Sequence, residues 1–456
     1  MTSLSFRLNG RDTALAGSDP TESLLRWLKR QRLTGTKEGC ADGDCGACTV
    51  AMIQVDTDGL PRWRAVNSCL LPMGSMVGRD VLTVEALADS DRLHPAQQAM
   101  VDCAGSQCGY CTPGFVMSLF VGRQNGESGD HVIEGNLCRC TGYQPIRAAG
   151  AQLTALPATD ERFQTALAAS QSPLARVELG AYFSPTSIDA ALTLKAHYPD
   201  AVWIAGATDL GVDLSHGKPV APAFIALDRI DALQRIEVQE DAVSIGAGVT
   251  LSRIERELSG VFPALDQMLS WFAARQVRNR ATFGGNLGTA SPIGDLLPVL
   301  LALDATVHLR GPQGARALPI DGYFLDYRKT ARAPDELIEA VTLPRRAGTI
   351  TASLKVAKRQ TDDISIVAAT FVLAFDTQRR VGHARLAYGG VAAIPRRAKS
   401  VETFLLGRVL DAETLKEAAA RLRTEFTPLD DHRGSAEYRS ALCASLFAKF
   451  VAECVA

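Results

Sequence analysis

Eight of the eleven cysteines fall into two groups whose spacing is typical of metal ligation. In the first group, Cys40, Cys45 and Cys48 follow the pattern C-x4-C-x2-C, and Cys69 supplies a fourth thiol from a later segment. This spacing is used to hold a [2Fe–2S] cluster, with three thiolates on one loop and the fourth from elsewhere. A four-thiolate zinc site is the alternative, but zinc sites usually contain paired C-x2-C knuckles. We therefore predict an iron–sulfur cluster here.

The loop that carries the first group is rich in small residues. Gly39, Gly43 and Gly46 alternate with the cysteines, together with Ala41 and Ala47. Small residues allow unusual backbone conformations and leave amide N–H groups free to hydrogen-bond the sulfur atoms. The composition of the loop thus supports a cluster held close to the backbone.

The second group combines Cys108-x2-Cys111 with Cys138-x-Cys140. Counting alone would allow zinc as readily as iron. Pro113, directly after Cys111 and Thr112, suits the first turn of a helix. The remaining thiols, those of Cys103, Cys443 and Cys454, lack partner spacing, and we expect them to be small buried hydrophobic groups.

The segments that position these cysteines change character along the chain. Residues 1–10 alternate apolar and polar side chains like a strand, and residues 21–32 read as a helix. Helical spacing follows from residue 84 to 150, with helices expected at 95–101 and 115–120. Residues 151–179, rich in Ala, Ser and Thr, read as a linker. Strands and helices mix after residue 182, and a last α+β segment starts near residue 349.

Two glycine-bearing loops in the middle region could hold phosphates through backbone N–H groups and polar side chains. Their residues are Trp203, Ile204, Ala205, Gly206, Ala207, Thr208, Asp209 and Leu210 in the first, and Thr282, Phe283, Gly284, Gly285 and Asn286, followed by Asp295, in the second. Taken singly, each loop is weak evidence, because strands often end in such turns.

A dinucleotide-binding βαβ unit is a rival interpretation for the segment that starts at Ile245 and contains Gly246 and Gly248. The third glycine position of that motif is occupied by Leu251, and Asp266 lies in a helix-like run instead of ending a second strand. We therefore interpret this segment as a strand and a turn of the middle region.

Composition fits a soluble intracellular enzyme. The 456 residues carry a net charge of −2 with 21% charged residues, so no polybasic surface indicates nucleic acid or an anionic membrane. The sequence contains neither an apolar signal core nor a stretch that approaches the ~20 apolar residues of a membrane-spanning helix. Eleven cysteines without a secretion signal favour metal ligation in the reducing cytoplasm.

The flanks of the second cysteine group resemble the molybdenum hydroxylases, the family of xanthine dehydrogenase and aldehyde oxidase. The segments are QCGYCTPG around Cys108 and GNLCRCTGY around Cys138. The resemblance extends over the chain and implies an α+β multidomain protein. Its expected parts are a β-grasp [2Fe–2S] ferredoxin-like domain (1–84), a helical-bundle [2Fe–2S] domain (85–155), a linker (156–179), an α+β FAD-binding domain (180–346) and an α+β C-terminal flavoprotein domain (349–456).

By the same resemblance, residues 203–210 and 282–286 would hold the FAD pyrophosphate, with Asp295 as a further contact. Phe272 matches an aromatic that stacks on the flavin ring, although core packing is an equal alternative. Ile338 and Lys355 align with further FAD contacts. Asp362 is the candidate for tuning the face of the flavin that meets NAD, with a solvated loop acid as the alternative.

The resemblance also implies a function. The family's substrate chemistry needs molybdopterin on a further large domain, which we expect on a partner chain, with two small and two large chains in a heterotetramer. The clusters and FAD would pass electrons from molybdenum to NAD. The domain order resembles that of the xanthine dehydrogenases, which implies oxidation of hypoxanthine to xanthine and of xanthine to urate.

Three alternatives stay open. The chain could serve an aldehyde or N-heterocycle hydroxylase, although those enzymes generally carry clusters and FAD on separate chains. It could be a stand-alone NADH-dependent reductase, or its cysteines could be zinc knuckles of a scaffold protein.

Overall fold

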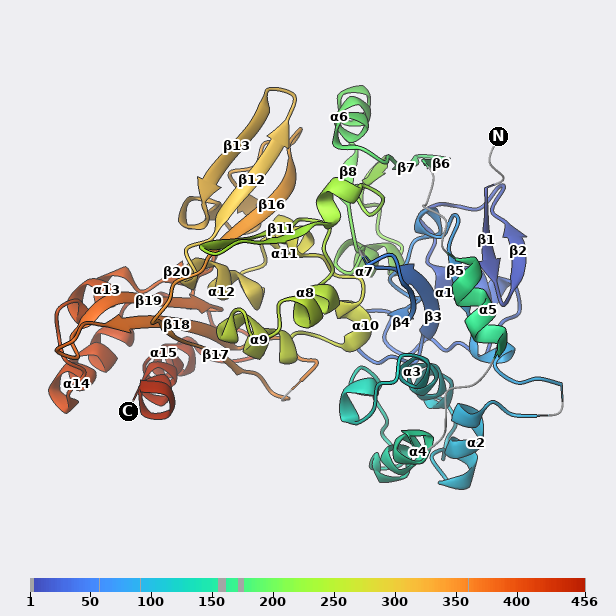
Figure 1. Cartoon of the computed structure of the whole chain (residues 1–456), viewed down its shortest axis with the longest axis horizontal. Helices are drawn as coiled ribbons and strands as arrows, with labels where there is room; N and C mark the ends of the chain where they lie inside the picture. The colour runs from blue at the N-terminus through green and yellow to red at the C-terminus, as the bar shows by residue number, and fades with distance from the viewer. Residues whose placement is uncertain are drawn as a thin grey trace. The chain divides into compact units, whose positions relative to one another are not determined.

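The computed structural model describes residues 4–56, 58–90, 92–154, 161–170, 176–359 and 361–455. The chain divides into two compact units (Figure 1). The first contains Met1–Ala232 and Ala273–Ala281, and the second contains Leu233–Phe272 and Thr282–Ala456. The predicted FAD-binding domain, residues 180–346, thus has parts in both units.

The first unit begins with a five-stranded mixed sheet in the order β2-β1-β5-β3-β4. Its elements are β1 (Ser5–Leu8), β2 (Arg11–Ala14), α1 (Leu24–Arg30), β3 (Thr49–Val55), β4 (Pro61–Asn67) and β5 (Asp80–Leu82). Helix α1 is shorter than the predicted 21–32, because Ser23 caps it by accepting a hydrogen bond from the Arg26 amide. Trp27 on α1 packs edge-on against Phe6 of β1, with ring centroids 5.4 Å apart. This arrangement is the expected β-grasp.

Three helices form the predicted bundle, drawn together in cyan to green in Figure 1: α2 (Pro95–Asp102), α3 (Thr112–Gln124) and α4 (Gln144–Thr154). Each of them packs on the other two. Helix α2 starts at Pro95, as the sequence predicted, and the structure adds His94 as its cap. The Thr112–Pro113 start of α3 lies directly after Cys111, so this thiol stands at a helix start.

The predicted linker is partly wrong, because it contains helix α5 (Glu161–Ala169). Phe163 of α5 is buried, and its ring lies 4.8 Å from that of Phe120 and 6.3 Å from that of Trp63. Aromatic burial therefore outweighs the linker-like composition of this segment. The flanking residues 155–160 and 171–175 lie outside the described residues.

The first unit ends with a four-stranded sheet in the order β6-β7-β9-β8. Its elements are β6 (Val177–Leu179), β7 (Tyr182–Ser184), α6 (Ile188–His197), β8 (Val202–Ile204), α7 (Leu210–Ser215) and β9 (Phe224–Ala226). Strand β9 runs parallel to both β7 and β8, so the loops after β8 and β9 lie at one edge of the sheet. Helix α10 (Arg275–Arg278), from a later segment, also belongs to this unit.

The second unit contains the sheet β10-β11-β16-β12-β13, which is antiparallel throughout. Its elements are β10 (Ile236–Val238), β11 (Ala242–Gly246), α8 (Leu251–Glu257), α9 (Pro263–Ser270), α11 (Phe283–Thr289), α12 (Leu296–Ala302), β12 (Thr306–Gly311), β13 (Gly314–Pro319), β14 (Phe324–Asp326), β15 (Lys329–Thr330) and β16 (Leu337–Pro344). Because β11 pairs antiparallel on both sides, the segment from Ile245 is no parallel dinucleotide-binding unit.

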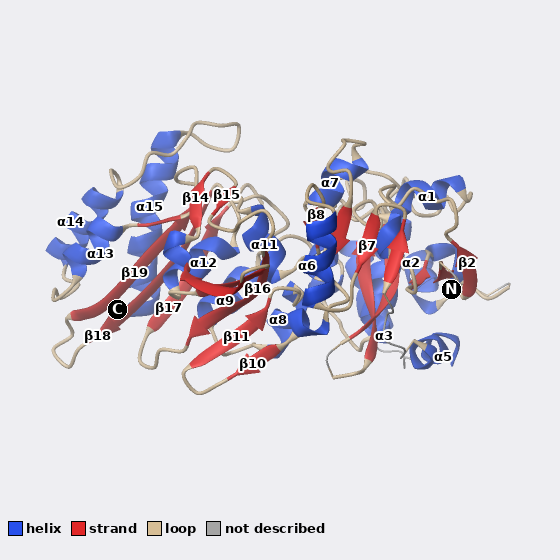
Figure 2. Cartoon of the chain, turned by 90° about the horizontal axis from the view of Figure 1, so that it is seen from above, coloured by secondary structure: helices blue, strands red, loops and turns tan. Residues whose placement is uncertain are grey.

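The chain ends in the predicted α+β segment. It consists of β17 (Ile350–Val356), β18 (Val367–Phe375), β19 (Val381–Gly389), β20 (Arg396–Arg397), α13 (Lys399–Leu405), α14 (Ala412–Leu422) and α15 (Ala436–Phe450). Helices α13 and α15 contact β19 and β18, and Figure 2 shows α13, α14 and α15 beside this sheet. Phe371 stacks on Phe450 at the centre of the core, with ring centroids 5.1 Å apart. Among the described helices, none is long and apolar enough to cross a bilayer.

Candidate metal centres and flavin site

The structure brings the first four cysteines together as two thiol pairs. Cys40 hydrogen-bonds Cys45, and the Sγ atoms of Cys48 and Cys69 lie 3.3 Å apart. Cys40 and Cys48 are close enough to influence each other's charge. The hydrogen bond from Cys45 lowers the pKa of Cys40 to about 5, and that from Cys69 lowers the pKa of Cys48. One thiol of each pair is therefore shifted toward the thiolate that binds metal.

The backbone of this loop also faces the sulfur atoms. The amides of Asp42 and Cys45 both donate to Cys40 Sγ at 3.4 Å. Ala41 has φ 62° and Gly43 has φ 88°, so the loop uses the left-handed conformations that its small residues permit. These contacts are the amide-to-sulfur hydrogen bonds that the composition of the loop predicts, and such bonds tune a cluster's potential.

The second four cysteines pair in the same manner. Cys108 hydrogen-bonds Cys140, and Cys111 hydrogen-bonds Cys138. The Tyr110 backbone amide and, less strongly, Cys140 lower the pKa of Cys108. Burial raises the pKa of Cys111 to about 12, and the hydrogen bond to Cys138 adds to that shift.

The two sets differ in exposure. Cys48 and Cys69 are buried in the first set, whereas Cys108 and Cys140 are exposed in the second. Within the part of the chain that the structure describes, no three Cys, His, Asp or Glu side chains are grouped to hold a single metal ion. Pairs of thiols suit a two-iron cluster, which takes two thiolates per iron, better than one tetrahedral zinc ion.

The two cysteine loops contact each other through glycines. A Cβ atom on Gly46 would lie 2.1 Å from the Gly135 carbonyl oxygen, and one on Gly114 would lie 2.3 Å from that of Gly46. The Leu137 amide donates to the Cys45 carbonyl at 3.0 Å, so Cys45 accepts this bond and Cys138 directly follows its donor. The glycines in the motifs thus allow backbone to pack on backbone where the two metal centres meet.

Of the two predicted phosphate loops, the first one has free backbone donors. The amides of Ala205, Gly206, Ala207 and Thr208 donate to no other residue that the structure describes. Ala207 has φ 65°, which turns the loop after β8. Gly206 is packed against backbone, since a Cβ there would lie 1.9 Å from the Arg280 carbonyl oxygen. Consecutive free amides in such a turn form a concave site for an anion.

The second loop uses its amides internally, which differs from the predicted role of its glycines. The amides of Phe283 and Gly284 donate to the carbonyls of Val249 and Ala247, and that of Gly285 donates to the Thr282 hydroxyl at 3.0 Å. Gly284 permits close packing instead, because a Cβ there would lie 2.5 Å from that of Ala247. The buried Asn286 Oδ1, which has no partner among the described residues, is the polar group that remains for a ligand.

Several predicted flavin residues of the second unit meet around one buried ion pair. Lys355 Nζ lies 2.7 Å from Asp295 Oδ2 and donates to the Trp271 carbonyl at 2.9 Å. Burial raises the pKa of Asp295, and the charge of Lys355 opposes that shift. Phe272, the next residue after Trp271, is partly buried, and its stacking on a flavin stays a prediction.

The two remaining candidates occupy separate places in the second unit. Ile338 is buried on β16, and its side chain lies 3.8 Å from the position of a Cβ on Gly288. Asp362 is buried with φ 51°, and its carbonyl accepts from Arg359 Nη2 at 2.8 Å. Asp362 is therefore a buried residue with a fixed backbone and not a solvated loop acid. Its role at the flavin remains a prediction.

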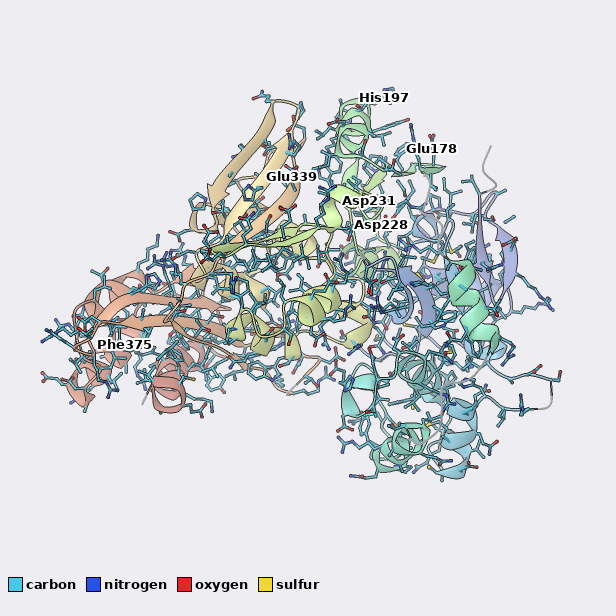
Figure 3. The ribbon with its side chains drawn as sticks, viewed as in Figure 1. Glu178, His197, Asp228, Asp231, Glu339 and Phe375 are labelled. Atoms are coloured by element: carbon cyan, nitrogen blue, oxygen red, sulfur yellow. The ribbon has the colours of Figure 1, made fainter. Side chains whose placement is uncertain are left out.

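Sequence reasoning missed a buried charge cluster in the first unit. Asp228, labelled in Figure 3, follows β9 and pairs with Arg79 from the segment before β5. Arg280 lies 3.9 Å from the same carboxylate, and Arg229 donates to the Val77 carbonyl at 2.6 Å. These four residues connect the β-grasp to the sheet that carries the first phosphate loop. Their spacing along the chain offers no signal, since they come from three distant segments.

Four family models match the chain in order. They are the 2Fe-2S iron-sulfur cluster binding domain at residues 6–73, the [2Fe-2S] binding domain at 83–151, the FAD binding domain in molybdopterin dehydrogenase at 175–346, and the CO dehydrogenase flavoprotein C-terminal domain at 352–454. Together with the paired thiols, these matches define an iron–sulfur flavoprotein with two [2Fe–2S] clusters and FAD.

Similar proteins of known name narrow the family to which this iron–sulfur flavoprotein is related. The xanthine dehydrogenase of Emericella nidulans is 30% identical over 98% of this chain and 38% of its own length, and that of Oryza sativa subsp. japonica is 31% identical over 94% and 38%. The chain is the electron-transfer module, carrying the iron–sulfur and FAD domains, of a molybdenum hydroxylase. It spans about two fifths of the length of these xanthine dehydrogenases.

Solved structures of the family resemble part of the chain. Carbon monoxide dehydrogenase from Hydrogenophaga pseudoflava matches with a TM-score of 0.57 and 27% identity over 60% of this chain and 96% of that one. Quinoline 2-oxidoreductase from Pseudomonas putida 86 matches with a TM-score of 0.56 and 25% identity over 61% and 98%.

Proposed function

We propose that the chain is the electron-transfer small subunit of a xanthine dehydrogenase, in which a partner chain binds molybdopterin and oxidises hypoxanthine and xanthine. NAD is the proposed acceptor, and two small and two large chains form the proposed heterotetramer. The main support is the single alignment with xanthine dehydrogenases over 94–98% of this chain. The carbon monoxide and quinoline enzymes instead match as chains that account for only 60–61% of it.

The residues present fit the groups that this function needs. The four thiol pairs would hold the irons of two clusters, and the free amides of residues 205–208 would bind the FAD pyrophosphate. In the second unit, we propose that five further residues contact FAD: Phe272, Asn286, Asp295, Ile338 and Lys355. When bound, the clusters carry single electrons and FAD can take two. This chemistry allows the two electrons released by a substrate to be passed on to NAD.

In this proposal, the chain holds the two metal centres in place and sets how far each one is exposed to water. The buried Cys48 and Cys69 keep the first centre away from water, whereas the exposed Cys108 and Cys140 leave the second accessible to a partner. Eight of the eleven cysteines are candidate cluster ligands and none of the eleven forms a disulfide bond among the described residues, which fits the proposed location in a reducing cytoplasm.

The test is purification of the native complex followed by assay of NAD reduction with xanthine, hypoxanthine, aldehydes and quinoline. We expect a second chain that contains molybdenum and turnover with the two purines. A complex that oxidises aldehydes or quinoline and leaves xanthine unchanged would contradict the substrate proposal. Purification of the chain without any partner would contradict the subunit proposal and favour a stand-alone reductase.

A further inference from the structure

A buried polar junction lies in the first unit, where the two cysteine loops meet. Gln276 of α10 contributes its Nε2 atom, which lies 3.3 Å from Thr49 Oγ1, 3.3 Å from Ser118 Oγ and 3.2 Å from Asn136 Oδ1. Thr49 follows Cys48, Ser118 lies on α3, and Asn136 precedes Cys138 by two positions. Three other segments therefore converge on the side-chain amide of Gln276.

The directions of the neighbouring hydrogen bonds show that the side chain at position 276 must donate hydrogen bonds. The Thr49 hydroxyl donates to the Gly46 carbonyl at 2.6 Å, and the Ser118 hydroxyl donates to Asn136 Oδ1 at 2.6 Å. Both hydroxyl oxygens can therefore only accept at this point, as can Asn136 Oδ1, and the two N–H donors of Gln276 Nε2 are shared among these three acceptors. A carboxylate in place of the amide would face three acceptors.

The junction holds the contact between the two centres. With its oxygen bound by Ser118 and Gln276, Asn136 turns its Nδ2 to the Gly46 carbonyl at 3.0 Å. The next amide along the chain, that of Leu137, donates to the Cys45 carbonyl at 3.0 Å. These two bonds join the loop of Cys45 to the loop of Cys138.

Gln276 is expected to lower the stability of the fold at this position. Its side chain is 1% exposed, and its Oε1 atom has no hydrogen-bond partner among the described residues. A Cβ on Gly135 would lie 1.8 Å from that oxygen, so the amide fits only beside a glycine. An unpaired buried carbonyl lowers stability, so stability alone does not explain an amide here.

We infer that Gln276 is a positioning residue that holds the two cluster loops in register for electron transfer between them. The inference rests on the proposed electron-transfer function, because register matters only if both centres carry electrons. It assigns a role in that transfer to α10, a segment that carries none of the eight cysteines.

The decisive variant is Gln276→Met in the full chain loaded with iron, sulfide and FAD. Methionine fills similar space and removes both the donor and the unpaired carbonyl, so the fold should be retained. We expect the Leu137 amide to exchange with deuterium about tenfold faster, equivalent to about 1.4 kcal/mol of lost protection. After mixing with NADH, the flavin should be reduced at the wild-type rate and the Cys108–Cys140 cluster, followed by its EPR signal, about tenfold more slowly.

Gln98→Met, at an exposed position on α2, is the control and should change neither measurement. Wild-type exchange and wild-type cluster reduction in Gln276→Met, at unchanged iron and FAD content, would overturn the inference. If Gln276→Met lost iron, Ser118→Ala, which removes one contact of the same junction, would carry the test with the same two outcomes. A wild-type chain that NADH does not reduce would contradict the proposed acceptor alone, because the exchange measurement does not depend on NADH.

Discussion

At the scale of single residues, the thiol pairs carry the chemistry of the chain. Four cysteines of one centre come from two segments, and the Sγ contact of Cys48 with Cys69 shows that both segments deliver their thiols to one place. The pKa of Cys40 and that of Cys48 are both lowered, so one thiol of each pair is shifted toward the thiolate that binds metal.

Cys69→Ser should remove the first cluster and leave the second. A serine hydroxyl is a poor substitute for thiolate, so the iron content should fall from about four to about two per chain. Iron analysis and EPR of the reduced chain measure this. Cys103→Ser, which changes a thiol outside both sets, should keep all the iron, and a Cys69→Ser chain with undiminished iron would contradict the assignment.

The buried carboxylate of Asp228 gives a prediction with a pH dependence. Burial alone would raise its pKa, but the charges of Arg79, Arg280 and Arg229 together lower it below the ordinary value. Asp228→Asn leaves these guanidinium groups unpaired and should reduce the free energy of unfolding by about 3 kcal/mol at neutral pH.

The sign of the pH effect follows from the lowered pKa. The stabilisation by Asp228 is complete above the pKa of an unfolded Asp, about 3.9, and is lost as the pH falls through the lower folded value. Urea unfolding at several pH values should therefore show the difference between wild type and Asp228→Asn shrinking only below about pH 4. A difference that already disappears at pH 6 would be inconsistent with this carboxylate as its source.

At the scale of elements, two kinds of contact position the centres. Helix starts and strand ends present the thiols, and glycines allow the loops that carry them to touch. Gly114, in the first turn of α3, is the clearest case, because a Cβ there would lie 2.3 Å from the Gly46 carbonyl oxygen. The clash could be relieved only by moving the Gly46 carbonyl or the start of α3, and each of these lies beside a cysteine of one centre.

Gly114→Ala should displace α3 from the first cysteine loop and impair assembly of the second cluster. Gly150→Ala is a matched control on α4 of the same bundle, where the new Cβ would lie 3.4 Å from a Leu119 methyl group. That control should keep its iron and gain up to about 1 kcal/mol in stability, since alanine favours helices over glycine. Equal iron content in the two variants would show that the close approach at Gly114 has no functional consequence.

At the scale of the whole molecule, the residues predicted to contact FAD belong to both compact units. The loop with free amides belongs to the first, while Phe272, Asp295, Ile338, Lys355 and Asp362 belong to the second. Within the second unit, the Lys355–Asp295 pair holds β17, the start of α12 and the Trp271 carbonyl together. The residues predicted to hold the cofactors are therefore spread over most of the chain.

Asp362→Ala should affect electron transfer to NAD and leave electron transfer to the clusters unchanged. If the carboxylate shapes the NAD side of the flavin, NAD-linked turnover of the complex should fall about tenfold, about 1.4 kcal/mol of transition-state stabilisation. Turnover with an artificial acceptor that takes electrons from the clusters should be retained. The same loss with both acceptors would place the role of Asp362 elsewhere.

The sequence alone determined the cofactor classes and the order of the domains. Cysteine spacing is a local property, because a loop that surrounds a small cluster must place its thiols at set intervals, and helix starts such as Pro95 depend on neighbouring residues. The helix α5 was missed because its stability comes from Phe163 packing on distant aromatic residues, which composition does not report.

Only the tertiary structure decided how these parts meet. The pairing of thiols, the use of amides in the second glycine loop, and the contacts of Asp228 and Gln276 all depend on segments far apart in the sequence. Such contacts are set by packing and by the need to pair buried polar groups, and neither leaves a pattern in spacing along the chain.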